Sequence, residues 1–304
     1  MAPEASAGLR LGVDLGGSKI EIVALGDGGR ELLRRRVPTP SSDYRGTLLA
    51  VSELVQAAER ELDARASVGL GIPGCLSQVT GRVKNANSTC LIGQPLKQDI
   101  EALLGREVRI ANDANCFALS EAVDGAGADA GVLFGVILGT GVGGGVVVAR
   151  RVLEGANAIA GEWGHNPLPL PQQADLPLPN CYCGRRGCIE TYLSGPGLSA
   201  LHRAASGRNL APPEIAAAAE GGDRHAEAAL AQYEERLARS LASVINIIDP
   251  DVIVLGGGLS NITRLYQSVP RLWRPHVFSD SVSTRLERNR HGDSGGVRGA
   301  AWLW

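Results

Sequence analysis

One local pattern occurs twice in this chain: an apolar strand, a glycine-rich turn and a second apolar strand. The first copy joins a predicted strand at Arg10–Asp14 to one at Ile20–Ala24, and the second joins Val132–Leu138 to Val146–Ala149. Self-similarity of this kind indicates an internal duplication, in which each copy contributes to the sheet of its own lobe. We therefore expect an α/β protein with two duplicated lobes and a ligand cleft between them.

Strands alternate with helices along the rest of the chain, which supports the α/β class. Apolar residues recur at helical spacing in Thr47–Ala64 and Arg224–Ile248, and a further helix is expected at Asp113–Val123. Leu168–Pro179 is rich in proline, and we expect an exposed loop there. The other predicted elements are strands at Arg34–Pro38, Val68–Ile72, Val108–Ala111 and Val252–Leu255 and a terminal helix at about Gly296–Trp304.

The length and composition are those of a two-domain globular protein. The 304 residues suffice for two domains, which we place at residues 1–112 plus about 292–304 and at residues 113–291. Hydrophobic residues make up 44% and charged residues 20%, which excludes the disordered class. The net charge of −2 and the lack of a long basic tract argue against a nucleic-acid partner. We expect a cytoplasmic protein without a membrane partner, because no signal peptide and no apolar run of membrane-spanning length are evident.

A group of metal-ligand residues lies in the second half of the chain. Its members are His165, Cys181, Cys183 and Cys188. Three thiolates and one imidazole complete the tetrahedral shell of Zn²⁺ and leave no position for water, which is typical of a structural site. The alternative is a set of buried thiols or a disulfide, but a Cys-x-Cys pair is poorly placed to bridge itself. Gly184 and Gly187 suit a tight metal-binding turn, so we predict structural zinc.

The glycine-rich turns are candidate phosphate sites. The first, Asp14–Lys19, is not a P-loop, because the Gly-Lys-Ser order is absent and a strand follows where a P-loop needs a helix. The second, Gly139–Gly145, matches Gly-x-Gly-x-x-Gly, but the strand after it argues against dinucleotide binding. Each glycine could serve only the conformation of its turn. Backbone N–H groups in such turns also bind phosphates, and Asp14 at a strand end could hold Mg²⁺.

A third glycine loop, after the strand at Val252–Leu255, could lie against the sugar and base of a nucleotide. The predicted nucleotide contacts are Asp14, Gly16, Gly17, Ser18, Lys19, Gly139, Thr140, Gly141, Gly143, Gly256, Gly257 and Gly258.

Asp113 lies where a predicted strand ends and a helix begins, next to Asn112. One interpretation is that Asp113 only caps the helix. The other is that it acts as a general base, because phosphoryl transfer to a sugar needs a carboxylate beside the attacking hydroxyl. Asn112 could orient the same sugar through its amide. Glu162, Glu190 and the second ring nitrogen of His165 are candidate partners for further sugar hydroxyls.

These residues belong to motifs that resemble those of the ROK family of sugar kinases, over nearly the whole chain. The motifs are Asp14–Lys19, Asn112–Asn115, Gly139–Gly145, Gly161–His165 and Cys181–Glu190. Other stretches look closest to the bacterial fructokinase (manno(fructo)kinase) branch of that family. They are Asn85–Thr89, Ser120–Gly125, His165–Pro169 and His291–Trp304.

The resemblance implies a two-lobed, actin-like (ribonuclease H-like) ATPase fold that binds ATP and Mg²⁺, and it implies a homodimer. It implies phosphorylation of D-fructose at the 6-hydroxyl, with mannose as a second substrate and Asp113 as the general base. The implied sugar contacts are Asn87, Asn112, Asp113, Glu162, His165 and Glu190.

Three alternatives stay open. A glucokinase or an N-acetylglucosamine kinase would use the same scaffold, because hexoses differ by the placement of single hydroxyls. A catalytically inactive sugar sensor is disfavoured because Asp113 and both phosphate turns are retained. A sugar-binding transcriptional repressor would need an N-terminal helix-turn-helix, whereas about nine residues precede the first predicted strand.

Overall fold

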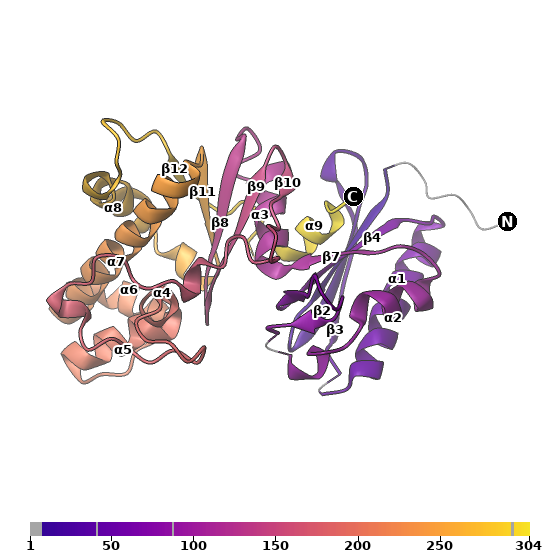
Figure 1. The fold of residues 1–304 in the computed structure, drawn as a ribbon, viewed down its shortest axis with the longest axis horizontal. Coiled ribbons are helices and arrows are strands. Elements are labelled where there is room, and N and C mark those ends of the chain that lie inside the picture. Colours follow the sequence, from indigo (N-terminus) through magenta and orange to yellow (C-terminus); the bar gives the residue numbers. More distant parts are fainter. Residues whose placement is uncertain (1–7, 41, 87, 293–294) are drawn as a thin grey trace. The chain divides into compact units, whose positions relative to one another are not determined.

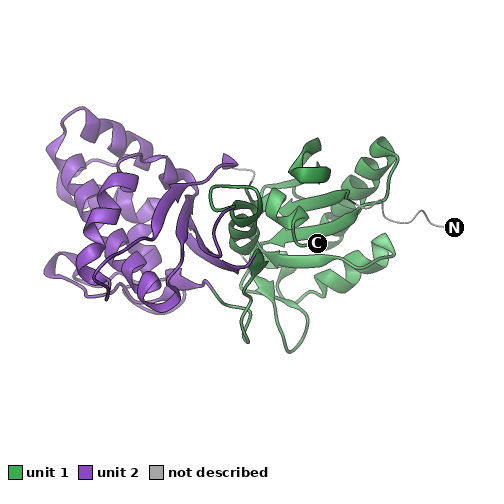
Figure 2. Cartoon of the chain, turned by 90° about the horizontal axis from the view of Figure 1, so that it is seen from above, with its two compact units in different colours: residues 1–128, 150–160, 293–304 green, residues 129–149, 161–292 purple. Residues whose placement is uncertain are grey.

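The computed structural model describes residues 8–40, 42–86, 88–292 and 295–304. The chain divides into two compact units (Figure 2). Unit 1 comprises Met1–Ala128, Arg150–Ala160 and Asp293–Trp304, and unit 2 comprises Asp129–Ala149 and Gly161–Gly292. In the described part of the chain, no helix combines the length and apolarity that a membrane crossing needs.

The sheet of unit 1 is built around the first predicted hairpin. Its strands are β1 (Arg10–Leu15), β2 (Lys19–Leu25), β3 (Glu31–Pro38), β4 (Ser67–Ile72) and β7 (Arg109–Asn112). They lie in the order β3-β2-β1-β4-β7. Figure 1 labels four of them, β2, β3, β4 and β7. The β1–β2 and β2–β3 pairs are antiparallel, whereas β4 is parallel to both β1 and β7. Parallel neighbours need crossover connections, which explains why helices separate these strands in the sequence.

Helices cover both faces of this sheet. The helices of unit 1 are α1 (Tyr44–Leu62), α2 (Leu96–Leu104), α3 (Asp113–Val123) and α9 (Gly295–Ala301). Leu11 and Val13 of β1 belong to the buried core that also contains the apolar faces of α1 and α2. Gly12 points to the opposite face, where a Cβ atom would lie 2.0 Å from the carbonyl oxygen of Val297 in α9. Glycine at this position therefore lets α9 lie directly on the strand backbone.

Helix α3 lies in unit 1, whereas the predicted boundary after residue 112 would assign it to the other lobe. It packs against α9, and the contact is backbone to backbone. A Cβ atom at Gly299 would lie 1.6 Å from the carbonyl oxygen of Cys116, so the approach requires glycine. The partner helix is almost two hundred residues away in the sequence, and the local pattern around Asn112 carries no signal of it.

The sheet of unit 2 repeats the arrangement around the second hairpin. Its strands include β8 (Val132–Leu138), β9 (Val142–Val148), β11 (Val252–Gly256) and β12 (Arg285–Arg288). They lie in the order β9-β8-β11-β12. The β8–β9 hairpin is antiparallel, and β11 is parallel to both β8 and β12. The antiparallel hairpin followed by a parallel neighbour matches the β1–β2 and β4 arrangement, so the predicted duplication and α/β class are confirmed.

The second hairpin differs from the prediction in the extent of its turn. Strand β9 begins at Val142, so Gly143 and Gly144 are paired strand residues and not part of a long glycine turn. A Cβ atom at Gly144 would lie 2.8 Å from the carbonyl oxygen of Gly161 and 2.9 Å from the ring of Trp163. This glycine therefore serves close packing within unit 2 rather than the conformation of a turn.

A long helix, α7 (Arg224–Ile248), contributes many of the buried residues in the core of unit 2. Leu230, Leu237 and Leu241 are buried along one stripe of it, as helical spacing predicts. The Asp223 carboxylate caps the helix by accepting a hydrogen bond from the His225 N–H at 2.8 Å. The other helices of unit 2 are α4 (Ile189–Leu193), α5 (Gly195–Ser206), α6 (Pro212–Glu220) and α8 (Leu265–Leu272).

Several short elements complete the described chain. They are strands β5 (Cys75–Leu76), β6 (Val83–Lys84) and β10 (Arg151–Val152) and the 3₁₀ helices η1 (Asp27–Gly29), η2 (Thr89–Leu91), η3 (Trp163–His165), η4 (Gln173–Asp175), η5 (Gly258–Asn261) and η6 (Arg274–His276).

The proline-rich segment Leu168–Pro179 is only partly the exposed loop that its composition predicts. Asp175 within it is buried, and its carboxylate pairs with Arg236 at 2.7 Å and Arg239 at 2.9 Å, both on α7. The main-chain oxygen of Asp175 accepts a hydrogen bond from the Tyr192 hydroxyl at 2.9 Å. The segment is thus fastened to both α7 and α4, through partners about sixty residues and about seventeen residues away.

Candidate active site and metal centre

The predicted metal ligands come together in unit 2. The ligand atoms of His165, Cys181, Cys183 and Cys188 all lie within 4.8 Å of one another. The Cys181 Sγ atom is 3.6 Å from His165 Nδ1, and the Cys183 Sγ atom is 3.7 Å from Cys188 Sγ. Ligands on a tetrahedral zinc ion at bond lengths of about 2.3 Å would be roughly 3.8 Å apart. The donor set and its spacing therefore fit a zinc ion.

The turn that carries these thiols has the backbone that the sequence predicts. Gly184 and Gly187 have φ angles of 86° and 70°, in the left-handed region that favours glycine. A hydrogen bond from the backbone N–H of Arg185 lowers the pKa of Cys183, whereas burial and the neighbouring thiols raise the pKa of Cys188 to about 12. Without metal Cys188 keeps its proton, so metal binding must release it, and metal affinity falls at low pH.

His165 is held by a short helix that is anchored on the second hairpin. The indole N–H of Trp163 donates to the carbonyl oxygen of Gly143 at 3.0 Å, and its ring meets Phe134 edge-on at 5.7 Å between centroids. A Cβ atom at Gly164 would lie 2.2 Å from the carbonyl oxygen of Val142, so η3 lies directly on β9. This packing fixes the positions of the His165 imidazole and of Glu162, which lies at the start of η3.

Glu190 follows the last thiol by two residues, in the first turn of α4. One of its carboxylate oxygens accepts a hydrogen bond from the backbone N–H of Val142 at 2.9 Å. Burial, then the charges of Glu190, Cys181 and Glu162, raise the pKa of Tyr182. Within unit 2 the structure thus gathers Glu162, His165 and Glu190 beside the metal cluster.

A cavity of about 590 Å³ in unit 2 joins two of the predicted glycine loops. Gly139 and Thr140 line it, together with Gly258. Gly257 instead lies against β8, where a Cβ atom would be 2.4 Å from the carbonyl oxygen of Leu138, and Gly256 ends β11. Other lining residues were not singled out from the sequence: Pro196, Ser199, Asn209, Pro212 and Pro213. Of these, the prolines could have been noticed in the sequence, because proline is common in the first turn of a helix and so marks where α5 and α6 begin.

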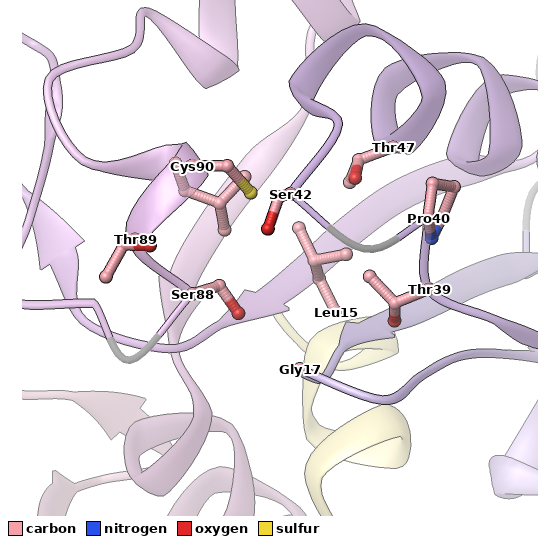
Figure 3. Close-up of a pocket in the computed structure, with 10 residues that line it drawn as sticks. Leu15, Gly17, Thr39, Pro40, Ser42, Thr47, Ser88, Thr89 and Cys90 are labelled. Carbon is pink, nitrogen blue, oxygen red and sulfur yellow. The ribbon is translucent and has the colours of Figure 1, made fainter.

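The first glycine turn closes the β1–β2 hairpin in unit 1. The backbone N–H of Gly16 donates to the carbonyl oxygen of Lys19 at 3.0 Å. Lys19 lies 3.7 Å from the carboxylate of buried Glu21, so its ammonium group is already paired. Beside the turn lies a cavity of about 220 Å³, lined by Gly17 and by hydroxyl groups that include that of Ser88 (Figure 3).

The charge of Asp113 acts on Asp14 within unit 1. Burial, followed by the negative charges of Asp113 and Glu21, raises the pKa of Asp14 to about 6. A divalent cation would relieve this repulsion, and carboxylate oxygens are the ligands that Mg²⁺ prefers. Asp14 therefore fits the predicted magnesium role.

Asn112, not Asp113, caps helix α3. Its side-chain oxygen accepts from the backbone N–H of Ala114 at 2.9 Å, and its amide donates to the carbonyl oxygen of Gly74 at 3.0 Å. Asp113 is the first helical residue, and its carboxylate accepts from the same Ala114 N–H at 2.8 Å, so it also contributes to the start of the helix. Asn112 also lines a cavity of about 340 Å³ within unit 1. Asn87, predicted as a further sugar contact, lies outside the described residues.

Two α/β units, each built around a strand–turn–strand hairpin followed by a parallel strand, are characteristic of the actin-like class of ATPase folds. The model of the ROK family matches residues 10–304, and the chain belongs to that family.

Full-length relatives and solved structures agree with this assignment. The chain is 43% identical over 296 residues to N-acetyl-D-glucosamine kinases of Salmonella gallinarum and Salmonella typhimurium, covering 96% of this chain and 98% of each relative. A ROK hexokinase from Thermus thermophilus is 33% identical and superposes with a TM-score of 0.86 over 97% of both chains. A ROK glucokinase from Streptomyces griseus, solved with glucose and AMPPNP, is 27% identical, with a TM-score of 0.76 over 97% of this chain and 99% of that one. The predicted family and the two-lobed actin-like fold are thus confirmed.

Proposed function

We propose that this ROK-family sugar kinase transfers the terminal phosphoryl group of Mg-ATP to the 6-hydroxyl of N-acetyl-D-glucosamine. The observation that carries the proposal is the 43% identity to N-acetyl-D-glucosamine kinases over nearly the full length of both chains. Fructose, placed first from the sequence, has no support among the relatives described above. The motifs that suggested it are scaffold motifs, and they do not report on the placement of single sugar hydroxyls.

Asp113 is assigned as the general base. It takes the proton of the 6-hydroxyl while the sugar oxygen forms its bond to phosphorus and the bond from phosphorus to the departing ADP oxygen breaks. The start of α3 fixes the position of the carboxylate, which accepts a hydrogen bond from the backbone N–H of Ala114 at 2.8 Å. The cap contributed by Asn112 holds that helix start in place.

The nucleotide and its metal are assigned to the glycine turns. The cavity of unit 2 beside Gly139, Thr140 and Gly258 is large enough for a nucleoside. The backbone N–H groups at the tip of the β1–β2 turn, at Gly17 and Ser18, suit a phosphate chain, and Asp14 suits the accompanying Mg²⁺. Magnesium, when bound, neutralises charge on the transferred phosphoryl group.

The sugar hydroxyls are assigned to Glu162 and Glu190, on the side of the metal cluster where His165 lies, and zinc is assigned a structural role beside them. A zinc ion bound by His165 would fix the position of the imidazole directly. Bound also by Cys188, it would fix the start of α4, whose first turn carries Glu190. The metal would therefore order the sugar site without entering the reaction.

The proposal is tested by measuring ADP release with Mg-ATP and a panel of N-acetyl-D-glucosamine, glucose, mannose and fructose. We expect the highest kcat/KM with N-acetyl-D-glucosamine. We expect Asp113→Asn to lower kcat by roughly a hundredfold or more while the circular dichroism spectrum stays unchanged, because general base catalysis contributes about 10²–10⁴.

Other results would redirect the assignment. A preference for fructose would restore the sequence-based substrate, and turnover of no sugar by zinc-replete protein would contradict kinase activity. Near-normal turnover by Asp113→Asn would remove Asp113 as the base.

A further inference from the structure

The two ring nitrogens of His165 face different groups. Nδ1 lies 3.6 Å from the Cys181 thiol and is directed into the metal cluster. Nε2 lies 3.0 Å from the hydroxyl of Tyr182. The nitrogen that the sugar would be expected to contact is therefore already engaged by a side chain that the motifs of the sequence did not single out.

Tyr182 is held firmly yet remains open to solvent. Its ring meets the His165 imidazole edge-on, with 5.2 Å between centroids and 85° between planes. Its backbone lies between two metal ligands, Cys181 and Cys183, in the tight turn described above. The residue is nevertheless 80% exposed. Such a side chain has a fixed hydroxyl and an accessible aromatic face, which is the arrangement that carbohydrate recognition uses.

We infer that Tyr182 is a sugar-contact residue, whose hydroxyl carries the hydrogen bond of His165 Nε2 outward to the N-acetylhexosamine. This inference rests on the proposed function of the same site. It adds Tyr182 to the proposed sugar site. It also names the tyrosine hydroxyl as the group that donates a hydrogen bond to a sugar oxygen or to the acetamide carbonyl.

The direction of the hydrogen bonds follows from the imidazole. When Nδ1 binds a metal, the neutral ring carries its proton on Nε2, which then donates to the Tyr182 oxygen. The hydroxyl hydrogen of Tyr182 is left to donate to an acceptor on the sugar. Glu162 at the start of η3 and Glu190 in the first turn of α4 are the acceptors assigned to sugar hydroxyls. The site thus combines a hydroxyl donor with carboxylate acceptors, and the aromatic face can cover an acetamide methyl group or the C–H face of the sugar ring.

An opposite role for Tyr182 makes the opposite prediction. If the side chain only covered His165 in the absence of sugar, the sugar would have to displace it. Removing the hydroxyl would then free Nε2 and strengthen sugar binding. The sign of the change in affinity separates the two roles.

The test is Tyr182→Phe, studied as zinc-loaded, full-length protein. The dissociation constant of N-acetyl-D-glucosamine is measured by calorimetry without ATP, and KM for sugar and for ATP is measured in the coupled assay. We expect the sugar dissociation constant and sugar KM to rise about three- to tenfold, as the loss of one neutral hydrogen bond predicts. ATP KM, zinc content and melting temperature should stay at wild-type values.

Tyr44→Phe is the matched control, because it also removes one tyrosine hydroxyl, which donates to Asp99 at 2.6 Å in unit 1. It should leave sugar affinity unchanged. Unchanged or tighter sugar binding by Tyr182→Phe would overturn the inference. If wild-type protein prefers another hexose, the substrate proposal fails, and Tyr182→Phe is then measured with that hexose, so the two failures are distinguished.

Discussion

Asp14 is a partly buried acid whose negative charge destabilises the folded protein. Its pKa is about 6 in the folded protein, against an ordinary value of 3.8. Because the folded state binds the proton more tightly, stability is highest below about pH 4 with respect to this group and falls as the pH rises through 6. At neutral pH the ionised carboxylate lowers the free energy of unfolding by roughly 3 kcal/mol. A bound cation would recover part of this loss, which links the cost to the proposed magnesium role.

Asp14→Asn should therefore raise the melting temperature at pH 7.5 by several degrees in the absence of nucleotide and magnesium. The gain should shrink steadily between pH 6 and pH 4, while kinase activity falls. Differential scanning calorimetry across this pH range measures it. Asp280→Asn, at an exposed position in unit 2, is the control and should change little. A gain that is independent of pH would contradict the raised pKa.

At the scale of elements, the proline-rich segment is held by a buried cluster of charges. Asp175 pairs with Arg236 and Arg239, and Arg239 also lies 2.7 Å from the carboxylate of Glu235. The guanidinium of Arg236 stacks over the Tyr192 ring at 4.8 Å. The cluster joins the segment before the metal turn to the helix after it. Removing one partner of a buried ion pair leaves the other charge buried and unpaired. This typically lowers the free energy of unfolding by about 3–5 kcal/mol.

We expect Asp175→Asn to lower the free energy of unfolding by roughly 3 kcal/mol, measured by urea denaturation. Glu235→Gln is the matched control, since that side chain is 29% exposed and its loss leaves the Asp175 pairs intact. The control should cost less than about 1 kcal/mol. Equal losses for the two variants would show that the buried carboxylate contributes no more than an exposed one.

At the scale of the whole molecule, each unit has a hydrophobic core of its own. The larger cluster of buried side chains lies within unit 2, and another lies between the sheet and helices α1 and α2 of unit 1. The turn that carries the thiols Cys181, Cys183 and Cys188 leads into α4 and pairs with the segment after η3, which packs on β9. All of these elements lie in unit 2. Loss of zinc should therefore loosen one unit and spare the other.

Cys183→Ser should lower zinc content and melting temperature together, because metal affinity contributes folding free energy at such sites. Hydrogen exchange should accelerate in Trp163–Leu193 and stay unchanged in β1 and β4. Cys90→Ser, which removes a thiol from unit 1, should leave both quantities unchanged. Exchange that rises equally in both units, or fresh protein without zinc, would contradict a structural metal confined to unit 2.

Local patterns predicted most of the fold and part of the site. The strands were evident as apolar runs, and the ligand spacing around Cys181 and Cys183 is local to one turn. Contacts between distant segments were not evident, because no periodicity links Asp175 to α7 or Gly299 to Cys116. Tyr182 was missed for a related reason: its role depends on which ring nitrogen of His165 faces the thiols. The preferred hexose was also beyond local patterns, since shared scaffold motifs pointed to fructose while full-length similarity favours N-acetyl-D-glucosamine.

The position of α9 has a consequence for the order of events during synthesis. The helix that lies on the backbone of Gly12 is made of residues 295–301. Nearly the whole chain must therefore be synthesised before this face of strand β1 is covered. All segments of unit 2 precede it in the sequence. On the ribosome, the inserted unit can therefore fold while the enclosing one is still exposed, and a chain stalled before residue 295 would present an uncovered sheet face to chaperones and proteases.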